Sequence, residues 1–157
     1  MKITKSRALM GVAIVAAALV GGQWLLTHST APIPQSTLMR SVTSEGQLDS
    51  IVAGAGSKLL VFDLYADWCG PCRTLSPRLE ALADTYGATV GFYRVNVDAN
   101  QAIASAFGVS GIPHVVFVKN GKAVTSLTGL YPREAYEKII TACAQTSGSC
   151  EKILSSL

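Results

Sequence analysis

Two thiols separated by two residues are the part of this sequence best suited to chemistry. Cys69 and Cys72 belong to the motif WCGPC (residues 68–72), which lies where an apolar run, residues 59–65, gives way to a helical pattern, residues 71–86. Cysteines at this spacing can form and break a disulfide by thiolate attack, passing two electrons to a partner. The motif therefore predicts a redox centre.

The start of the helix predicts different roles for the two thiols. Cys69 is expected beside unpaired backbone N–H groups and the positive end of the helix dipole, and Arg73 adds a cation, so its thiolate is favoured. Cys72 is expected to begin the buried stripe of the helix. We predict an exposed nucleophile, Cys69, and a shielded resolving thiol, Cys72. Pro71 has no N–H and suits a first helical turn.

Asp63 lies six residues before Cys69, inside the apolar run. Burial of a carboxylate without a partner is costly or raises its pKa, and such a group can accept a proton from a resolving thiol. The alternative is a structural carboxylate paired with a base such as Arg94 on the neighbouring strand. We favour the proton acceptor, although the two interpretations can both hold.

The elements that must position these residues alternate between strand and helix patterns. Residues 59–65 and 90–97 are apolar on both faces and predict central strands. The helix of residues 71–86 should be kinked by Pro77 and closed by Gly87. Further strands are expected at residues 38–42, 115–118 and 123–127, and further helices at residues 44–53, 101–107 and 132–143. This order predicts an α/β fold with a mixed central sheet flanked by helices.

The net charge comes from one end of the chain. Lys2, Lys5 and Arg7 are three of the 13 basic residues, and no acidic residue precedes Glu45. The remaining 13 − 3 = 10 basic residues balance 10 acidic ones. A neutral domain lacks the basic surface that nucleic acid binding requires, so we expect no nucleic acid partner.

Residues 1–26 predict a membrane-targeting segment. An uncharged stretch of 19 residues, 8–26, follows the basic start. As a helix it would extend roughly 28 Å, close to the hydrocarbon thickness of about 30 Å. We favour an uncleaved signal anchor, because Trp24 prolongs the apolar stretch beyond the small residues 20–22 at which a cleavable signal peptide would be cut. With an anchor or with a signal peptide, the rest of the chain is expected in the periplasm or another extracytoplasmic space. The uncleaved anchor would also hold it to the inner membrane.

The remaining boundaries follow from composition. Residues 27–37 are polar with two prolines and should form a linker. Residues 38–146 should form the single domain, followed by an extension at residues 147–157.

Cys143 and Cys150 form the second pair. On an unbroken helix they would lie about 10.5 Å apart, beyond the limit of about 7 Å for a disulfide. Residues 147–149 (SGS) can end that helix and fold the chain back. We predict a structural disulfide; the alternatives are a second redox relay, and a zinc or copper site built from both cysteine pairs.

The dithiol is part of a wider pattern that resembles the thioredoxin family over roughly residues 38–145. The motif has Asp63 before it, Pro77 after it, and Gly-Ile-Pro ending 41 residues after Cys72 (113 − 72), followed by Asn120-Gly121 and Gly129. On its own, Pro113 marks the start of a strand, and cis bonds are a minority before proline.

The resemblance implies a thioredoxin fold and a cis Ile112–Pro113 bond that faces the dithiol. It implies that the Ile112 backbone binds the substrate chain as an added strand. It assigns Cys69 as nucleophile, Cys72 as resolving thiol and Asp63 as buried acid/base. The site lining that it implies consists of Trp68, Gly70 and Pro71.

Three departures from the family are visible. The first is the targeting segment. The second is residues 63–69 (DLYADWC), which are similar to the periplasmic thioredoxin-like domain of transmembrane thiol-reductant conduits. The third is His114, where the family usually has a small hydroxyl residue. Its side chain should point away from the face of Pro113, so we favour a structural role over tuning of the dithiol.

The function expected is an exported, membrane-tethered protein-disulfide reductase that uses its two thiols and no cofactor. The resemblance implies oxidised protein substrates, a membrane thiol-reductant conduit as electron donor, and cytochrome c maturation or disulfide repair as client pathways. Gly70-Pro71 between the cysteines argues for a reducing dithiol. The alternatives are a disulfide oxidase or isomerase, a cysteine-based metal-binding module, and a non-catalytic adaptor.

Overall fold

The computed structural model describes residues 36–145 and residue 150. The chain divides into two units, Met1–Ala31 and Pro32–Leu157, and the described residues all belong to the second. The predicted targeting segment, most of the linker and most of the C-terminal extension lie outside the described residues. Within the described part, no helix combines the length and hydropathy that crossing a membrane requires.

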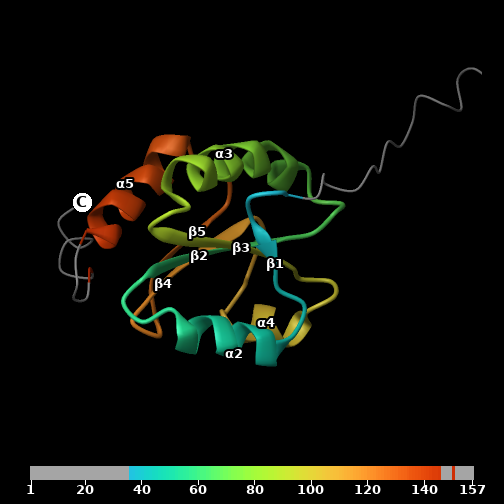
Figure 1. The fold of residues 1–157 in the computed structure, drawn as a ribbon. Helices are drawn as coiled ribbons and strands as arrows, with labels where there is room; N and C mark the ends of the chain where they lie inside the picture. Colours follow the sequence, from blue (N-terminus) through green and yellow to red (C-terminus); the bar gives the residue numbers. More distant parts are fainter. Residues whose placement is uncertain (1–35, 146–149, 151–157) are drawn as a thin grey trace, which may run out of the picture. The chain divides into compact units, whose positions relative to one another are not determined.

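Five strands form one mixed sheet in the order β1-β3-β2-β4-β5. They are β1 (Arg40–Ser41), β2 (Leu59–Tyr65), β3 (Val90–Asn96), β4 (His114–Lys119) and β5 (Lys122–Thr128). β3 pairs in parallel with β1 and β2, whereas β4 pairs antiparallel with β2 and β5. The helices are α2 (Glu45–Gly54), α3 (Gly70–Tyr86), α4 (Gln101–Ala106) and α5 (Arg133–Ala144). α3 and α5 cover one face of the sheet, and α2 and α4 cover the other (Figure 1), which confirms the predicted mixed α/β architecture.

The largest difference from the predicted elements is the first strand, which is shorter than residues 38–42. The backbone N–H groups of Leu38 and Met39 donate to Ser36 Oγ, over 3.2 Å and 2.6 Å. These donors are therefore used locally, and the ladder with β3 begins only at Arg40. The other ends shift by a residue or two. α3 runs through Pro77 to Tyr86 as one helix.

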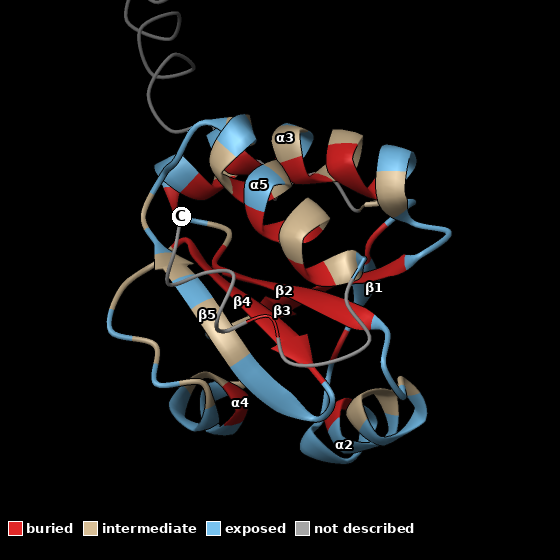
Figure 2. Ribbon diagram, turned by 90° about the vertical axis from the view of Figure 1, so that its left-hand side faces the viewer, coloured by how far each residue is buried: buried red, intermediate tan, exposed pale blue. Residues whose placement is uncertain are grey.

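Burial explains why the central strands are so apolar. Every residue of β2 and β4 is buried, whereas β5 at the sheet edge consists of exposed and half-buried residues (Figure 2). Leucines of α3 and the aromatic and isoleucine side chains of α5 form a core cluster on one face. A second cluster lies beneath α2 and α4. A third, small cluster contains Cys69 and Cys72 at the end of β2.

The structure pairs Cys143 with Cys150 in a disulfide whose Cα atoms lie 5.1 Å apart. α5 ends at Ala144, before Cys150, so the distance expected for two cysteines on one unbroken helix does not apply. Both cysteines are fully buried in the cluster of α3 and α5. The Lys119 ammonium donates to the Cys143 carbonyl over 2.7 Å, which ties the end of β4 to the same place.

Candidate dithiol active site

Cys69 and Cys72 form a disulfide at the N-terminus of α3, with Cα atoms 5.3 Å apart. A turn follows β2, in which the Cys69 N–H donates to the Ala66 carbonyl over 3.1 Å. Cys69 is the N-cap of α3, and its sulfur accepts a hydrogen bond from the Cys72 N–H over 3.2 Å. Pro71 occupies the first turn, where a missing N–H costs nothing. Local chain geometry thus places one sulfur against the helix N-terminus and the other within the helix.

The predicted exposure of Cys69 is wrong for this disulfide form, in which 3% of Cys69 and 2% of Cys72 are exposed. The two sulfurs are bonded to each other, and the pair packs with Tyr65 and Ala66 and against Ile112. The cysteines therefore differ here in their position on the helix and not in their exposure.

Asp63 is buried on β2, with 2% of its surface exposed. Burial raises the pKa of its carboxyl from 3.8 to about 7, although Arg94 acts in the opposite direction. Its Oδ1 has no hydrogen-bond partner among the residues that the structure describes. A carboxyl group with this pKa can exchange a proton near neutral pH.

Arg94 lies opposite Asp63 on β3 and is itself buried. Its guanidinium carbon stands 4.2 Å from the centre of the Tyr65 ring, a cation–π arrangement. The positive charge favours the ionised form of Asp63, but desolvation has the larger effect. Burial and the raised pKa fit the proton-acceptor interpretation and the nearby charge of Arg94 fits the paired one, and the role of Asp63 stays a prediction.

The peptide bond Ile112–Pro113 is cis, which confirms the expectation from the resemblance. Ile112 is half-buried against the cluster that contains the dithiol. The Pro113 carbonyl accepts a hydrogen bond from the Gly129 N–H over 2.8 Å. The segment at the start of β4 therefore lies between the disulfide and the chain that follows β5.

Trp68 is the most exposed large apolar side chain that the structure describes, at 65%. Its indole N–H donates to Asp98 Oδ2 over 2.9 Å. We did not predict Asp98 from the sequence. The available signal was its position just past β3, since β2 and β3 are parallel and their carboxyl ends meet at one edge.

His114 is buried, and its Nδ1 lies 2.7 Å from Thr128 Oγ1 on β5. Because strand residues alternate, His114 shares the face of Val116 and Val118, which pack beneath α2 and α4. Asp63 faces the other side, where Val61 packs against α3 and α5. Burial lowers the pKa of His114, which favours a neutral ring. These contacts support the structural role.

The two cysteine pairs do not come together. Cys143 and Cys150 belong to the cluster of α3 and α5, whereas Cys69 and Cys72 form part of the small cluster at the end of β2. Each pair is closed as its own disulfide. Within the described residues, no three His, Cys, Asp or Glu side chains are grouped as metal ligands. The shared four-sulfur site considered from the sequence is therefore wrong for this form.

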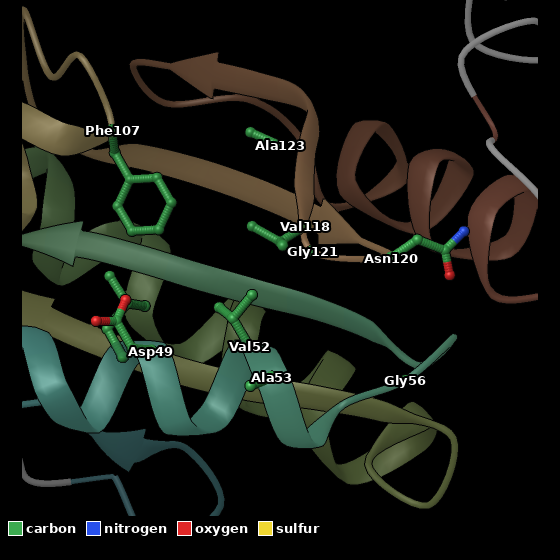
Figure 3. Close-up of a pocket in the computed structure, with 10 residues that line it drawn as sticks. Asp49, Val52, Ala53, Gly56, Phe107, Val118, Asn120, Gly121 and Ala123 are labelled. Atoms are coloured by element: carbon green, nitrogen blue, oxygen red, sulfur yellow. The ribbon is translucent and has the colours of Figure 1, made fainter.

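A pocket of about 510 Å³ lies elsewhere on the domain, between α2 and the turn that joins β4 to β5 (Figure 3). Its described lining includes Asp49, Val52, Phe107 and Gly121. The pocket lining does not include the dithiol, so the pocket and the candidate site are separate.

Comparison with known proteins agrees with this geometry. A family model described as Thioredoxin matches residues 40–142. The chain belongs to the thioredoxin family. This membership accounts for the dithiol, the buried Asp63 and the cis-proline together. The exported location stays a prediction, as does the similarity to the periplasmic domain of transmembrane thiol-reductant conduits.

Individual thioredoxins give the extent of the similarity. Thioredoxin-like protein 1 of Schizosaccharomyces pombe is 42% identical over 94 residues, which are 59% of this chain and 32% of that protein. Thioredoxin of Malassezia sympodialis is 42% identical over 78 residues, 49% of this chain and 74% of that protein. The chain spans about a third of the first of these relatives.

Solved thioredoxin structures share the fold. Thioredoxin of Fasciola hepatica superposes with a TM-score of 0.64 at 34% sequence identity, covering 67% of this chain and 99% of that one. Thioredoxin of Malassezia sympodialis gives a TM-score of 0.63 at 32% identity, covering 74% and 99%.

Proposed function

We propose that this protein is an exported thiol:disulfide oxidoreductase that reduces protein disulfides. The observation that carries the proposal is the Cys69–Cys72 disulfide at the N-terminus of α3, beside the cis-Pro113 segment and just beyond the end of β2, the strand that contains buried Asp63. Thioredoxin relatives are protein-disulfide oxidoreductases, and this chain carries the vicinal cysteine pair.

The reaction begins with the reduced dithiol. The Cys69 thiolate attacks one sulfur of a client disulfide, forming a mixed disulfide and releasing one client thiolate. The helix N-terminus stabilises this thiolate through backbone N–H groups that lack intrahelical partners, including that of Cys72, which already donates to Cys69 Sγ in the disulfide form. The backbone at Ile112 is proposed to hold the client as an added strand during the attack.

Cys72 then resolves the intermediate. Asp63 accepts the Cys72 thiol proton, and the resulting thiolate attacks Cys69 Sγ, releasing the second client thiolate. Two electrons have moved to the client, and the protein is left with the Cys69–Cys72 disulfide. A new cycle requires an external dithiol, for which we propose a membrane thiol-reductant conduit, with cytochrome c maturation or disulfide repair as the client pathway.

The proposed location depends on residues 1–26, which carry the basic start and the uncharged stretch. On the oxidising side of a membrane, a reductant must be recharged from elsewhere. The opposite direction, oxidation or isomerisation of client disulfides, is the second candidate function, because the same dithiol chemistry runs both ways. The Gly70-Pro71 dipeptide favours reduction.

The test is to trap clients in living cells with Cys72→Ser, which leaves Cys69 able to attack but removes the resolving thiol. Disulfide-linked partners should accumulate and disappear on treatment with a reductant, whereas the Cys69→Ser/Cys72→Ser variant should trap none. Equal yields from both variants would refute the mechanism. Equilibration of the purified domain with glutathione measures the reduction potential of the Cys69–Cys72 pair. A strongly oxidising potential would favour the oxidase alternative over the reductase.

A further inference from the structure

His114 is buried at the start of β4, directly after the Ile112–Pro113 segment, and has no part in the reaction proposed above. Its Nδ1 lies 2.7 Å from Oγ1 of Thr128, the residue opposite it on β5. The next residue along β5, Gly129, donates its N–H to the Pro113 carbonyl over 2.8 Å. Two adjacent hydrogen bonds, one between side chains and one between backbone groups, therefore fasten the segment to the end of β5.

The Thr128 side chain is close to the chain on both sides of the segment. Its hydroxyl bonds His114, and its methyl group lies near Gly111, where an added Cβ would stand 3.6 Å from Thr128 Cγ2. The hydroxyl and the methyl group turn together about χ1, which has few allowed values in a β-branched residue. The bond to His114 thus also fixes the methyl group beside Gly111.

The His114 ring lies in apolar surroundings. It is 5% exposed and faces the side of the sheet that packs beneath α2 and α4. The titratable side chains on the elements of this side are Tyr93 of β3, Arg40 of β1, Glu45 and Asp49 of α2, and Asp98 after β3. Each of these groups is exposed or bonded to another side chain. Within the described residues none of them bonds the ring, so a charge on His114 would be uncompensated.

Protonation of His114 would disturb this arrangement. Its Nε2 is buried and has no hydrogen-bond partner in the part of the chain that the structure describes. A neutral ring carries one N–H, whereas a charged ring carries two, and both need acceptors. Burial lowers the pKa of His114, so the ring stays neutral until the pH falls below its ordinary value of 6.5. A charged ring gains most by moving toward water, which breaks the bond to Thr128.

We propose that His114 and Thr128 are positioning residues for client binding: the neutral His114 ring holds the Ile112–Pro113 backbone where the client strand is added, and the charged ring releases it. The inference rests on the proposed function, because it takes the client to lie along this backbone. It adds a form of regulation, namely that the affinity for clients falls when the surroundings become acidic.

The test uses reduced protein and a capped ten-residue peptide that has one internal disulfide and no ionisable side chain. Single-turnover rates at increasing peptide concentration give a limiting rate and a half-saturating concentration. His114→Asn is the central variant, because an amide can bond Thr128 but cannot become charged. From pH 7 to pH 5 the half-saturating concentration should rise about threefold more in the wild type, since its binding-competent fraction falls.

Both proteins in this comparison contain Asp63, so the titration of Asp63 contributes equally to the two profiles. An equal rise of the half-saturating concentration in the wild type and in His114→Asn would overturn the inference. A difference confined to the limiting rate would overturn it as well, because a positioning residue for binding acts on the half-saturating concentration.

Thr128→Val tests the hydrogen bond at neutral pH. It removes the hydroxyl, keeps the side-chain shape and spares the core, because Thr128 is exposed. The half-saturating concentration should rise about threefold at an unchanged limiting rate, and the additional acid dependence should disappear. Thr125→Val is the matched control, the same change at the residue of β5 opposite Phe117. Equal effects of the two substitutions would refute a special role for the bond between His114 and Thr128.

NMR of the oxidised protein separates this inference from the proposed function, because it needs no client. The His114 ring should titrate below pH 6.5, and the amide signals of Ile112 and Gly129 should follow it in the wild type but not in His114→Asn. This result without reduction of the peptide would refute the proposed function and retain the link between the ring and the backbone. Reduction of the peptide with amide signals that ignore the ring would refute the inference alone.

Discussion

Asp63 shows how one buried group links stability to pH. Its pKa is about 7 in the folded disulfide form and 3.8 when unperturbed. Because the folded pKa is the higher one, the unfolded chain gives up its proton first as pH rises. The stabilisation associated with Asp63 is complete below about pH 4 and is lost by the time pH passes about 7.

Asp63→Asn should therefore flatten the pH dependence of stability. The wild type should lose roughly 4 kcal/mol more than the variant between pH 4 and pH 8, since each pKa unit corresponds to about 1.4 kcal/mol. Urea unfolding of the oxidised proteins at both pH values measures this difference. Parallel losses in the two proteins would contradict the raised pKa.

The same substitution should slow resolution of the mixed disulfide. Removing a general base costs roughly a hundredfold in rate, and the wild-type rate should fall as Asp63 becomes protonated below about pH 7. Single-turnover mixing with a disulfide-linked peptide follows this step. Asp84→Asn, an exposed change on α3, is the control, and a similar slowing there would remove the special role of Asp63.

At the scale of elements, the end of α5 is fastened by covalent and polar links. Cys143 is bonded to Cys150, and its carbonyl accepts from Lys119 at the end of β4. The last helix is thereby joined both to the chain that follows it and to the sheet. These links lie on the face of the sheet that contains Asp63 but in a different cluster from the dithiol.

Cys143→Ala/Cys150→Ala should lower the free energy of unfolding by about 2.5 kcal/mol, the loop-entropy estimate for a ring of about eight residues. Insulin reduction by the dithiol should keep its wild-type rate at temperatures where both proteins are folded. Thermal unfolding and the insulin assay measure the two effects. Lost activity in a folded variant would favour the relay alternative over a structural disulfide.

For the whole molecule, residues 1–37 should direct export without help from the domain. Fused to a reporter enzyme that folds only in an oxidising compartment, they should give activity in a bacterial host, and a fusion lacking residues 1–26 should give none. An uncleaved anchor should leave the reporter in the membrane after an alkaline wash. Release of a shortened reporter would indicate a signal peptide, and an inactive full fusion would refute export.

Local sequence patterns predicted much of the fold and of the candidate site. β2 matches its predicted range because seven successive buried residues leave a clear apolar run. The motif itself places two cysteines around the first turn of a helix, where covalent geometry allows a disulfide. The sequence predicts a first strand longer than β1, because it does not show that Ser36 Oγ accepts the N–H groups of Leu38 and Met39.

The sequence by itself determined the spacing of the dithiol, the apolar setting of Asp63 and the need for a break before Cys150, since these depend on neighbours along the chain. Only the tertiary structure decided the burial of Cys69 and two hydrogen bonds. One runs from the Trp68 indole N–H to Asp98, and the other from the Tyr131 N–H to the Tyr136 hydroxyl. Burial and pKa depend on what distant segments bring to one place. The strand order of the sheet, which pairs β2 with both β3 and β4, determines which of these distant segments become neighbours.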